Sequence, residues 1–232
     1  MRRRPAGLPT TRPAPQVLPL PMEIEAKFYL TDPDELRRRL SLLGGVLAHG
    51  PRLERNWRFD NADGRLAADG RVLRLRVDDH AHLTFKTPSD LPEFRGEIEF
   101  EVSDPAAAQA LLEALDYHPV WLYEKWRAVY RLDLAQVMLD ELPFGSFVEI
   151  EAASLDAVER VARRLGLDWK RRLASSYLGL FARLRQSRQL AFREATFEAF
   201  ADQSPVQPEE LGASDAMTEM DPSPRQTRES HE

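Results

Sequence analysis

The chain of 232 residues contains no cysteine. This absence excludes a disulfide framework, a thiolate zinc site and a cysteine nucleophile. Disulfides belong to oxidising compartments, so a chain without cysteine is compatible with the reducing cytoplasm, and we expect a cytoplasmic protein.

Long apolar runs are also missing. No stretch of 18 residues is free of charged side chains, so the sequence predicts neither a membrane-spanning helix nor a membrane partner. Three arginines near the start could open a secretion signal, but prolines recur throughout residues 1–21 and no apolar segment of sufficient length follows. We therefore expect residues 1–21 to be a disordered extension, with Met22 as the functional beginning.

A net basic charge is absent as well. The formal charge is −6, which argues against nucleic acid as the main partner. Residues 203–232 are polar, acidic and poor in aromatic side chains, so we expect disorder there. Residues 186–200 could form an amphipathic helix. The simplest organisation is one folded domain over residues 22–185, followed by a helical extension and a disordered acidic tail over residues 186–232.

Strict alternation of charged and apolar residues, which is typical of β-strands, recurs along the domain. Three helices interrupt the strands at 33–43, 105–115 and 155–165, and a last helix is expected at 175–186. Asp-Pro begins the first two, and glycine follows the first and third. Asp63-Gly64 and Phe144-Gly145 are interpreted as hairpin turns. The expected strands are 23–30, 56–60, 72–77, 83–86, 97–102, 125–130, 136–140 and 147–151.

The polar face of these strands is almost purely ionisable, and its charge segregates by strand. Strand 72–77 offers two arginines, strand 97–102 three glutamates, and strand 147–151 two glutamates. A solvated sheet face with cross-strand ion pairs is one reading. The opposite face is apolar enough to be covered by helices, so the sheet can instead close with its charged face inside. We therefore predict an α+β fold: an eight-stranded antiparallel closed β-barrel, or tunnel, with a charged lumen and helices packed outside.

An enclosed lumen of this kind is costly unless its charges are paired or neutralised by ligands. Carboxylates suit a hard divalent cation such as Mg²⁺ or Mn²⁺, and such cations usually bind through a few carboxylates together with substrate phosphates. The charged face therefore indicates a site for phosphate and metal, although it does not identify the phosphate compound.

Glu23-Ile24-Glu25-Ala26-Lys27 resembles the ExExK signature of the CYTH family, also called triphosphate tunnel metalloenzymes. ExExK alone is a weak signal, but further segments follow in the order typical of the family. They are Gly70-Arg71-Val72-Leu73-Arg74-Leu75-Arg76, Thr84-Phe85-Lys86, Arg95-Gly96-Glu97-Ile98-Glu99, Lys125-Trp126-Arg127, Leu139-Asp140-Glu141-Leu142, Val148-Glu149-Ile150-Glu151 and Ser176-Tyr177-Leu178.

The resemblance covers about residues 22–185 and implies a tunnel that binds a triphosphate with Mg²⁺ or Mn²⁺. By position, the implied metal ligands are Glu23, Glu25, Asp140, Glu149 and Glu151. The implied phosphate-binding residues are Lys27, Arg74, Arg76, Lys86, Lys125, Arg127 and, with a looser alignment, Lys170. Glu23, Glu25, Lys27 and Arg76 are expected to carry the catalysis.

Glu97, Glu99 and Glu101 are expected to orient the lumen cations, and the five histidines are expected at the surface. The leading interpretation of function is hydrolysis of inorganic tripolyphosphate. Class IV adenylyl cyclase activity, thiamine triphosphatase activity and non-catalytic polyphosphate binding remain alternatives. A small-molecule substrate is therefore the expected partner, and the chain is expected to be a monomer or homodimer.

Overall fold

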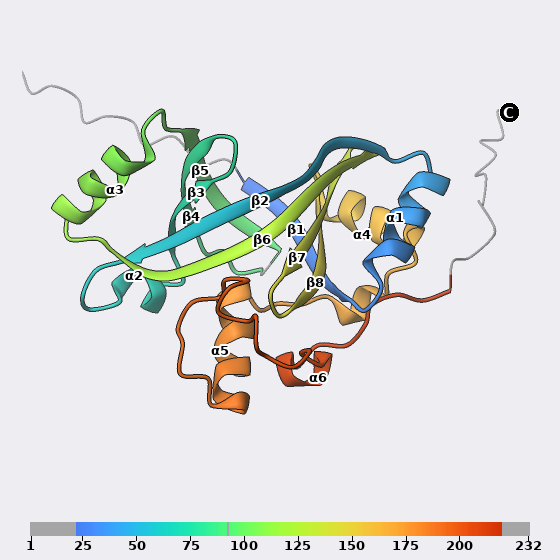
Figure 1. Ribbon diagram of the computed structural model, residues 1–232. Coiled ribbons are helices and arrows are strands. Elements are labelled where there is room, and N and C mark those ends of the chain that lie inside the picture. The colour runs from blue at the N-terminus through green and yellow to red at the C-terminus, as the bar shows by residue number, and fades with distance from the viewer. Residues whose placement is uncertain (1–21, 92, 220–232) are drawn as a thin grey trace, which may run out of the picture.

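A ring of eight antiparallel strands forms the centre of the molecule in the computed structural model, which describes residues 22–91 and 93–219. Each strand is hydrogen-bonded to two neighbours in the order β1-β5-β4-β3-β2-β6-β7-β8, and β8 pairs back onto β1 (Figure 1). The strands are β1 (Met22–Leu30), β2 (Val46–Asp60), β3 (Val72–Val77), β4 (Ala81–Thr87), β5 (Phe94–Glu101), β6 (His118–Leu132), β7 (Ala135–Leu142) and β8 (Gly145–Glu151). All eight expected strands are present.

The two longest strands, β2 and β6, extend well beyond the segments expected from the sequence. Each has 15 residues, and they pair with each other along most of their length. The pairing contains register shifts around His49 and after Arg58. Each shift interrupts the strict alternation of side chains, so the first half of β2 has no clear strand pattern.

The four expected helices form, with ends within about two residues of the expected positions. They are α1 (Pro33–Leu42), α3 (Pro105–Ala114), α4 (Leu155–Arg164) and α5 (Tyr177–Arg188). Their caps follow the sequence signals. The Asp32 carboxylate, for example, accepts hydrogen bonds of 3.0 Å from the backbone N–H groups of Asp34 and Glu35.

The Asp63-Gly64 segment is not a simple hairpin turn, contrary to expectation. It leads into a short helix, α2 (Arg65–Ala68), before β3 begins. The Asp60 carboxylate accepts hydrogen bonds of 2.9 Å from the backbone N–H groups of Leu66 and Ala67, which fixes the helix start. Phe144-Gly145 does turn between β7 and β8 as expected.

The outer face of the ring is partly covered by helices. Helices α1 and α4 lie together at one side of the ring, and α3 lies at the opposite side (Figure 1). Phe28, Val148 and Ile150 pack with Leu36 of α1 and Val158 of α4 in the main hydrophobic core. The apolar face is therefore covered in this region, as predicted.

Strand β5 is an exception to this covering. The side chains of Ile98 and Phe100 are 43% and 53% exposed, whereas the sequence pattern placed both against helices. Helix α3 contacts β3 and β4 instead, where Leu112 packs against Leu73 and Leu75.

Residues 190–219 lie against the domain, which differs from the disorder expected from residue 203 onward. The backbone of Ala195 adds a bridge to β6: its N–H donates to Leu122 O (2.9 Å) and its carbonyl accepts from Glu124 N (3.0 Å). A short helix, α6 (Pro208–Leu211), follows and contacts α5. Disorder was expected because the segment has few apolar residues. Those few, such as Leu211 and Ala216, are almost fully buried and hold the segment against the domain. The tail over residues 220–232 and the extension over residues 1–21 lie outside the described residues.

No helix among the described residues is both long enough and apolar enough to cross a membrane.

The packing of residues 190–219 predicts a stability effect. Phe200 is 8% exposed and packs against Phe144, Phe181 and Phe192. We expect Phe200→Ala to lower the free energy of unfolding by about 3 kcal/mol, as for other buried aromatic residues. Urea denaturation measures this change. Leu134→Ala is the control, because Leu134 is 95% exposed. Equal effects of the two substitutions would show that the segment does not pack on the domain.

Candidate functional site

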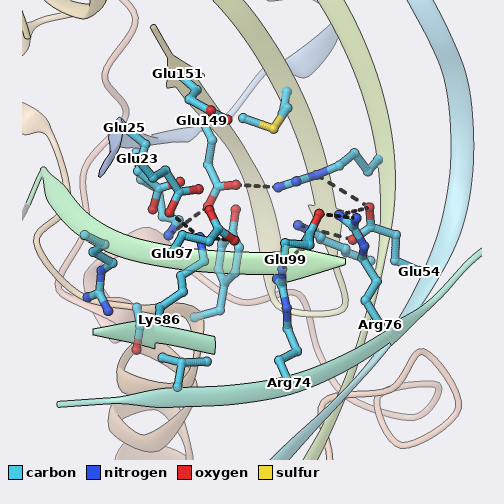
Figure 2. A pocket seen from close by; sticks show the side chains of 18 of the residues that line it. Glu23, Glu25, Glu54, Arg74, Arg76, Lys86, Glu97, Glu99, Glu149 and Glu151 are labelled. Carbon is cyan, nitrogen blue, oxygen red and sulfur yellow. Dashed lines mark hydrogen bonds and ion pairs between the residues drawn. The ribbon is translucent and has the colours of Figure 1, made fainter. Parts of the chain in front are cut away.

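A cavity of about 980 Å³ lies within the ring and is lined mainly by charged side chains. Side chains from β1, β3, β4, β5 and β8 point toward one another in it (Figure 2). Ten of the residues expected at the site line this cavity, namely Glu23, Glu25, Lys27, Arg74, Arg76, Lys86, Lys125, Arg127, Glu149 and Glu151. The strict alternation in the strands therefore does bring acidic and basic residues, distant in sequence, into one space.

Strand register explains why the acidic groups are neighbours. Glu25 on β1 lies opposite Glu151 on β8, and Lys27 lies opposite Glu149. Directly opposed like charges destabilise a strand pair, whereas the Lys27–Glu149 pair is favourable. The β1–β8 ladder thus contains one repulsive cross-strand pair, Glu25–Glu151, next to one attractive pair, Lys27–Glu149.

Glu23, Glu25 and Glu151 form an acidic corner of the cavity. Burial raises the pKa of Glu25, and the nearby Glu149 raises it further. Burial and the carboxylates of Glu23 and Glu25 raise the pKa of Glu151 to about 7. Burial also raises the pKa of Glu23, although its ion pair with Lys86 opposes the shift. The corner therefore concentrates more negative charge than its own cations neutralise.

Glu149 is held quite differently. It pairs with Lys27 at 2.9 Å and with Arg127. Burial alone would raise its pKa, but Lys27, Arg127 and Lys125 together hold the pKa of Glu149 well below its ordinary value. Lys27 also lies 4.1 Å above the ring of Tyr177, a cation–π contact. Lys27 is thus fixed from two sides.

Asp140, expected as a metal ligand, is fully buried and is not among the residues that line the cavity. Its carboxylate accepts hydrogen bonds from Lys125 Nζ (2.9 Å), from two Arg127 nitrogens (2.6 and 2.5 Å) and from the Tyr177 hydroxyl (2.8 Å). These contacts occupy its oxygens. In this structure Asp140 therefore orients two cavity cations from behind.

Glu54 was missed by the sequence reasoning. It lies on β2, is 3% exposed, and sits 3.5 Å from Lys125 and 3.9 Å from both Arg76 and Arg127. Burial opposes ionisation, but the surrounding cations lower the pKa of Glu54 to about 2. Arg52, Glu54, Asn56 and Arg58 alternate along β2, and this pattern could have revealed the strand and its carboxylate.

The arginine pair of β3 is oriented by Glu99, as expected. Glu99 lies 3.1 Å from Arg76 and 3.4 Å from Arg74, and it also accepts a 2.7 Å hydrogen bond from Thr84. Glu97 lies 3.5 Å from Lys86. Glu101 instead contacts His80 at 3.1 Å and does not line the cavity.

Two expectations about position need correction. Lys170 is exposed on the short 3₁₀ helix η1 (Trp169–Arg171) and does not line the cavity. Arg172, two residues on, lines it instead and pairs with Glu93 at 2.7 Å. Among the histidines expected at the surface, His49 and His80 are exposed as expected and also line the cavity, whereas His82 is partly buried in it. His80 and His82 stand on or next to β4, whose start lies earlier than the sequence pattern indicated.

The donor set fits a hard divalent cation. Carboxylate oxygens are the ligands that Mg²⁺ and Mn²⁺ prefer, and the raised pKa values of the acidic corner show a repulsion that a cation would relieve. Among the described residues, no three acidic or histidine side chains already converge as ligands around one point. Glu23 is turned toward Lys86 and Glu149 toward Lys27 and Arg127. Ligation would require Glu23 to exchange its lysine partner for the cation.

Comparison with solved structures identifies the same fold elsewhere. A candidate adenylate cyclase from Vibrio parahaemolyticus has a TM-score of 0.61 and 21% identity, over 69% of this chain and 98% of that one. The PH1012 protein from Pyrococcus horikoshii has a TM-score of 0.59 and 26% identity, over 67% and 96%. A Hippeastrum protein, described as a candidate adenylyl cyclase with a dominant triphosphatase activity, has a TM-score of 0.53 and 23% identity, over 69% and 95%.

No curated protein sequence is significantly similar to this chain. The family model of the CYTH domain, by contrast, matches residues 21–183. This range includes all eight strands of the ring and the start of α5. The chain therefore belongs to the CYTH family.

Proposed function

We propose that this chain hydrolyses a triphosphate, with inorganic tripolyphosphate as the preferred substrate, in a tunnel formed by the ring of strands. The observation that carries the proposal is the separation of charge within the cavity. An acidic corner of Glu23, Glu25 and Glu151 adjoins a set of cations, and both line one cavity. CYTH proteins in general depend on a metal and act on small triphosphates, which agrees with this arrangement.

The cations divide into two groups by how they are held. Lys27, Lys125 and Arg127 are fixed by Glu149, Asp140 and Glu54, so they present a preorganised surface for phosphate oxygens. Preorganised charge stabilises a transition state without reorganisation during the reaction. These three groups would hold the phosphates that are not transferred.

Arg74 and Arg76 form the second group. Both lie on β3 two residues apart, and both share Glu99 as their partner. A guanidinium can donate two parallel hydrogen bonds to one phosphate. The arginines would therefore orient the chain of phosphates and stabilise the charge that develops as the bond to the leaving group breaks.

The acidic corner would hold Mg²⁺ or Mn²⁺ through Glu23, Glu25 and Glu151, with Glu149 beside them. When bound, a divalent cation supplies neutralisation of phosphate charge and a water with a lowered pKa. The chain's own carboxylates fix where that cation sits relative to Arg76 and Lys27. Asp140 acts in this proposal as a positioning residue rather than as a ligand.

The Glu25→Ala variant tests the metal site. We expect phosphate release from tripolyphosphate with Mg²⁺ or Mn²⁺ to fall by more than about 100-fold, as when other charge-stabilising groups are removed. The melting temperature without metal should not fall, because the raised pKa of Glu25 reflects burial and repulsion. Glu194→Ala, which removes an exposed glutamate outside the cavity, is the control. Unchanged turnover in Glu25→Ala would remove Glu25 from the site.

The Arg76→Ala variant tests the phosphate clamp. Because Arg76 would contact both bound substrate and the developing charge, we expect KM to rise and kcat to fall, with kcat/KM reduced by more than about tenfold. Steady-state kinetics with tripolyphosphate, ATP and thiamine triphosphate measure the effect. Arg131→Ala removes an exposed arginine outside the cavity and serves as the control. Kinetics like those of the wild type would mean that Arg76 does not meet the substrate.

The acidic corner also predicts a pH-dependent stability. A carboxyl whose pKa is raised on folding binds its proton more tightly in the folded state, so stability falls as pH rises from the unfolded value, about 4.5, through the folded value, about 7 for Glu151. The lowered pKa values of Glu54 and Glu149 act only below about pH 4.5. We expect the metal-free protein to be less stable toward urea at pH 8 than at pH 5.5.

Two comparisons isolate this effect. Glu151→Gln should flatten the decline between pH 5.5 and pH 8, and Mg²⁺ should restore stability to the wild type at pH 8. If the wild type and Glu151→Gln show the same pH dependence, the corner is not as repulsive as its geometry indicates.

A further inference from the structure

Arg58 is a cavity cation with no acidic partner. It lies on β2 and lines the cavity, yet none of the described carboxylates comes within 4.0 Å of it, and its Nε has no hydrogen-bond partner there. Arg74 and Arg76, by comparison, share Glu99. A guanidinium removed from water without a counter-charge is costly, so its presence indicates an anionic ligand.

The neighbours of Arg58 add positive charge. Its cross-strand partner on β3 is Arg74, and Arg95 lies near enough to repel it. Burial, together with Arg74 and Arg95, lowers the pKa of Arg58 below its ordinary value, although it stays protonated near neutral pH. Three arginines are therefore neighbours, and among the described residues only Arg74 of these pairs with a carboxylate, although Arg95 lies opposite Glu23 of the acidic corner in the β1–β5 register.

The other cross-strand partner of Arg58 is Trp121 on β6. Its indole Nε1–H is buried and has no hydrogen-bond partner among the described residues, so it is an available donor. The indole ring is already stacked on two aromatic neighbours. Tyr123 stacks on it at 4.4 Å between ring centroids, and Phe181 of α5 stacks at 6.0 Å. This end of the cavity can therefore donate hydrogen bonds, while its indole already stacks on protein side chains.

The cavity is also large for a triphosphate. About 980 Å³ is at the upper end of the roughly 300–1,000 Å³ typical of pockets for drug-sized molecules. The cations assigned above to a triphosphate are Lys27, Lys86, Lys125, Arg127, Arg74 and Arg76. Arg58 and Arg95 are additional to this set.

We propose that Arg58, with Arg95 and the Trp121 indole N–H, forms a further anion subsite at the α5 end of the cavity, which takes a fourth phosphate group of a linear inorganic polyphosphate. This inference rests on the proposed function, because it extends the triphosphate site. It assigns the specificity of the cavity to the length of the phosphate chain rather than to an organic group.

Binding measured without metal separates this inference from the hydrolysis proposal. Isothermal titration calorimetry in EDTA compares tripolyphosphate, tetrapolyphosphate and ATP on the full chain. We expect the wild type to bind tetrapolyphosphate more tightly than tripolyphosphate. Arg58→Gln should lower the ratio of the two affinities by about tenfold, the effect of one lost charge-assisted contact. Arg58→Lys, which keeps the charge but loses the fork of donors, should give an intermediate ratio.

Arg55→Gln is the matched control, because Arg55 lies on the same strand but pairs with Glu124 outside the cavity. Its affinity ratio should equal that of the wild type. An equal loss of both polyphosphates in Arg58→Gln would make Arg58 part of the triphosphate site and overturn the inference. Unchanged affinity for both polyphosphates in Arg58→Gln would overturn the inference too. A loss of affinity for ATP alone would assign the subsite to a nucleotide. Because hydrolysis is not measured, a failure of the proposed function leaves this readout intact.

Discussion

Closure of the strand ring is the constraint on which the site depends. In a closed antiparallel ring, alternate side chains of every strand must share one interior. In this chain those side chains are largely Glu, Lys and Arg, so their charges have to balance across strands that are distant in sequence. Lys27 with Glu149, and Arg127 with Asp140, achieve that balance locally. Glu25, Glu151 and Arg58 do not, and we assign ligand binding to the places where the balance fails.

Buried ion pairs hold several of the cavity cations in position. Asp140 and Tyr177 are fully or nearly buried, and together they hold Lys125 and Arg127 in place. Glu54 adds a second counter-charge from β2. A buried ion pair contributes little net stability, because desolvation offsets attraction. Its value in this cavity is positional, since a cation held on several sides meets a phosphate without losing side-chain freedom at that moment.

Much of the fold could be predicted from the sequence, because alternation and capping are local signals. The strands and the four longer helices follow from them, and the alternation also places ten of the expected site residues on the face that lines the cavity, whereas their roles came only from the family resemblance. The failures have physical causes. Register shifts near His49 interrupt the alternation at the start of β2, so the expected strand began only at residue 56 and left out Glu54. Asp140 was expected as a metal ligand, and its local sequence gives no sign that Lys125, Arg127 and Tyr177, distant along the chain, donate hydrogen bonds to its oxygens. Residues 203–219 are polar on average, yet a few buried apolar residues suffice to pack them.

The central claim is that the acidic corner and the cationic walls serve one bound triphosphate with its metal. The most direct test is anomalous diffraction from crystals grown with Mn²⁺ and tripolyphosphate. The account predicts a manganese peak among Glu23, Glu25 and Glu151, with phosphate density extending from it toward Arg76 and Lys27 inside the ring. Manganese or phosphate bound only on the outer surface, with the cavity occupied by water, would contradict it.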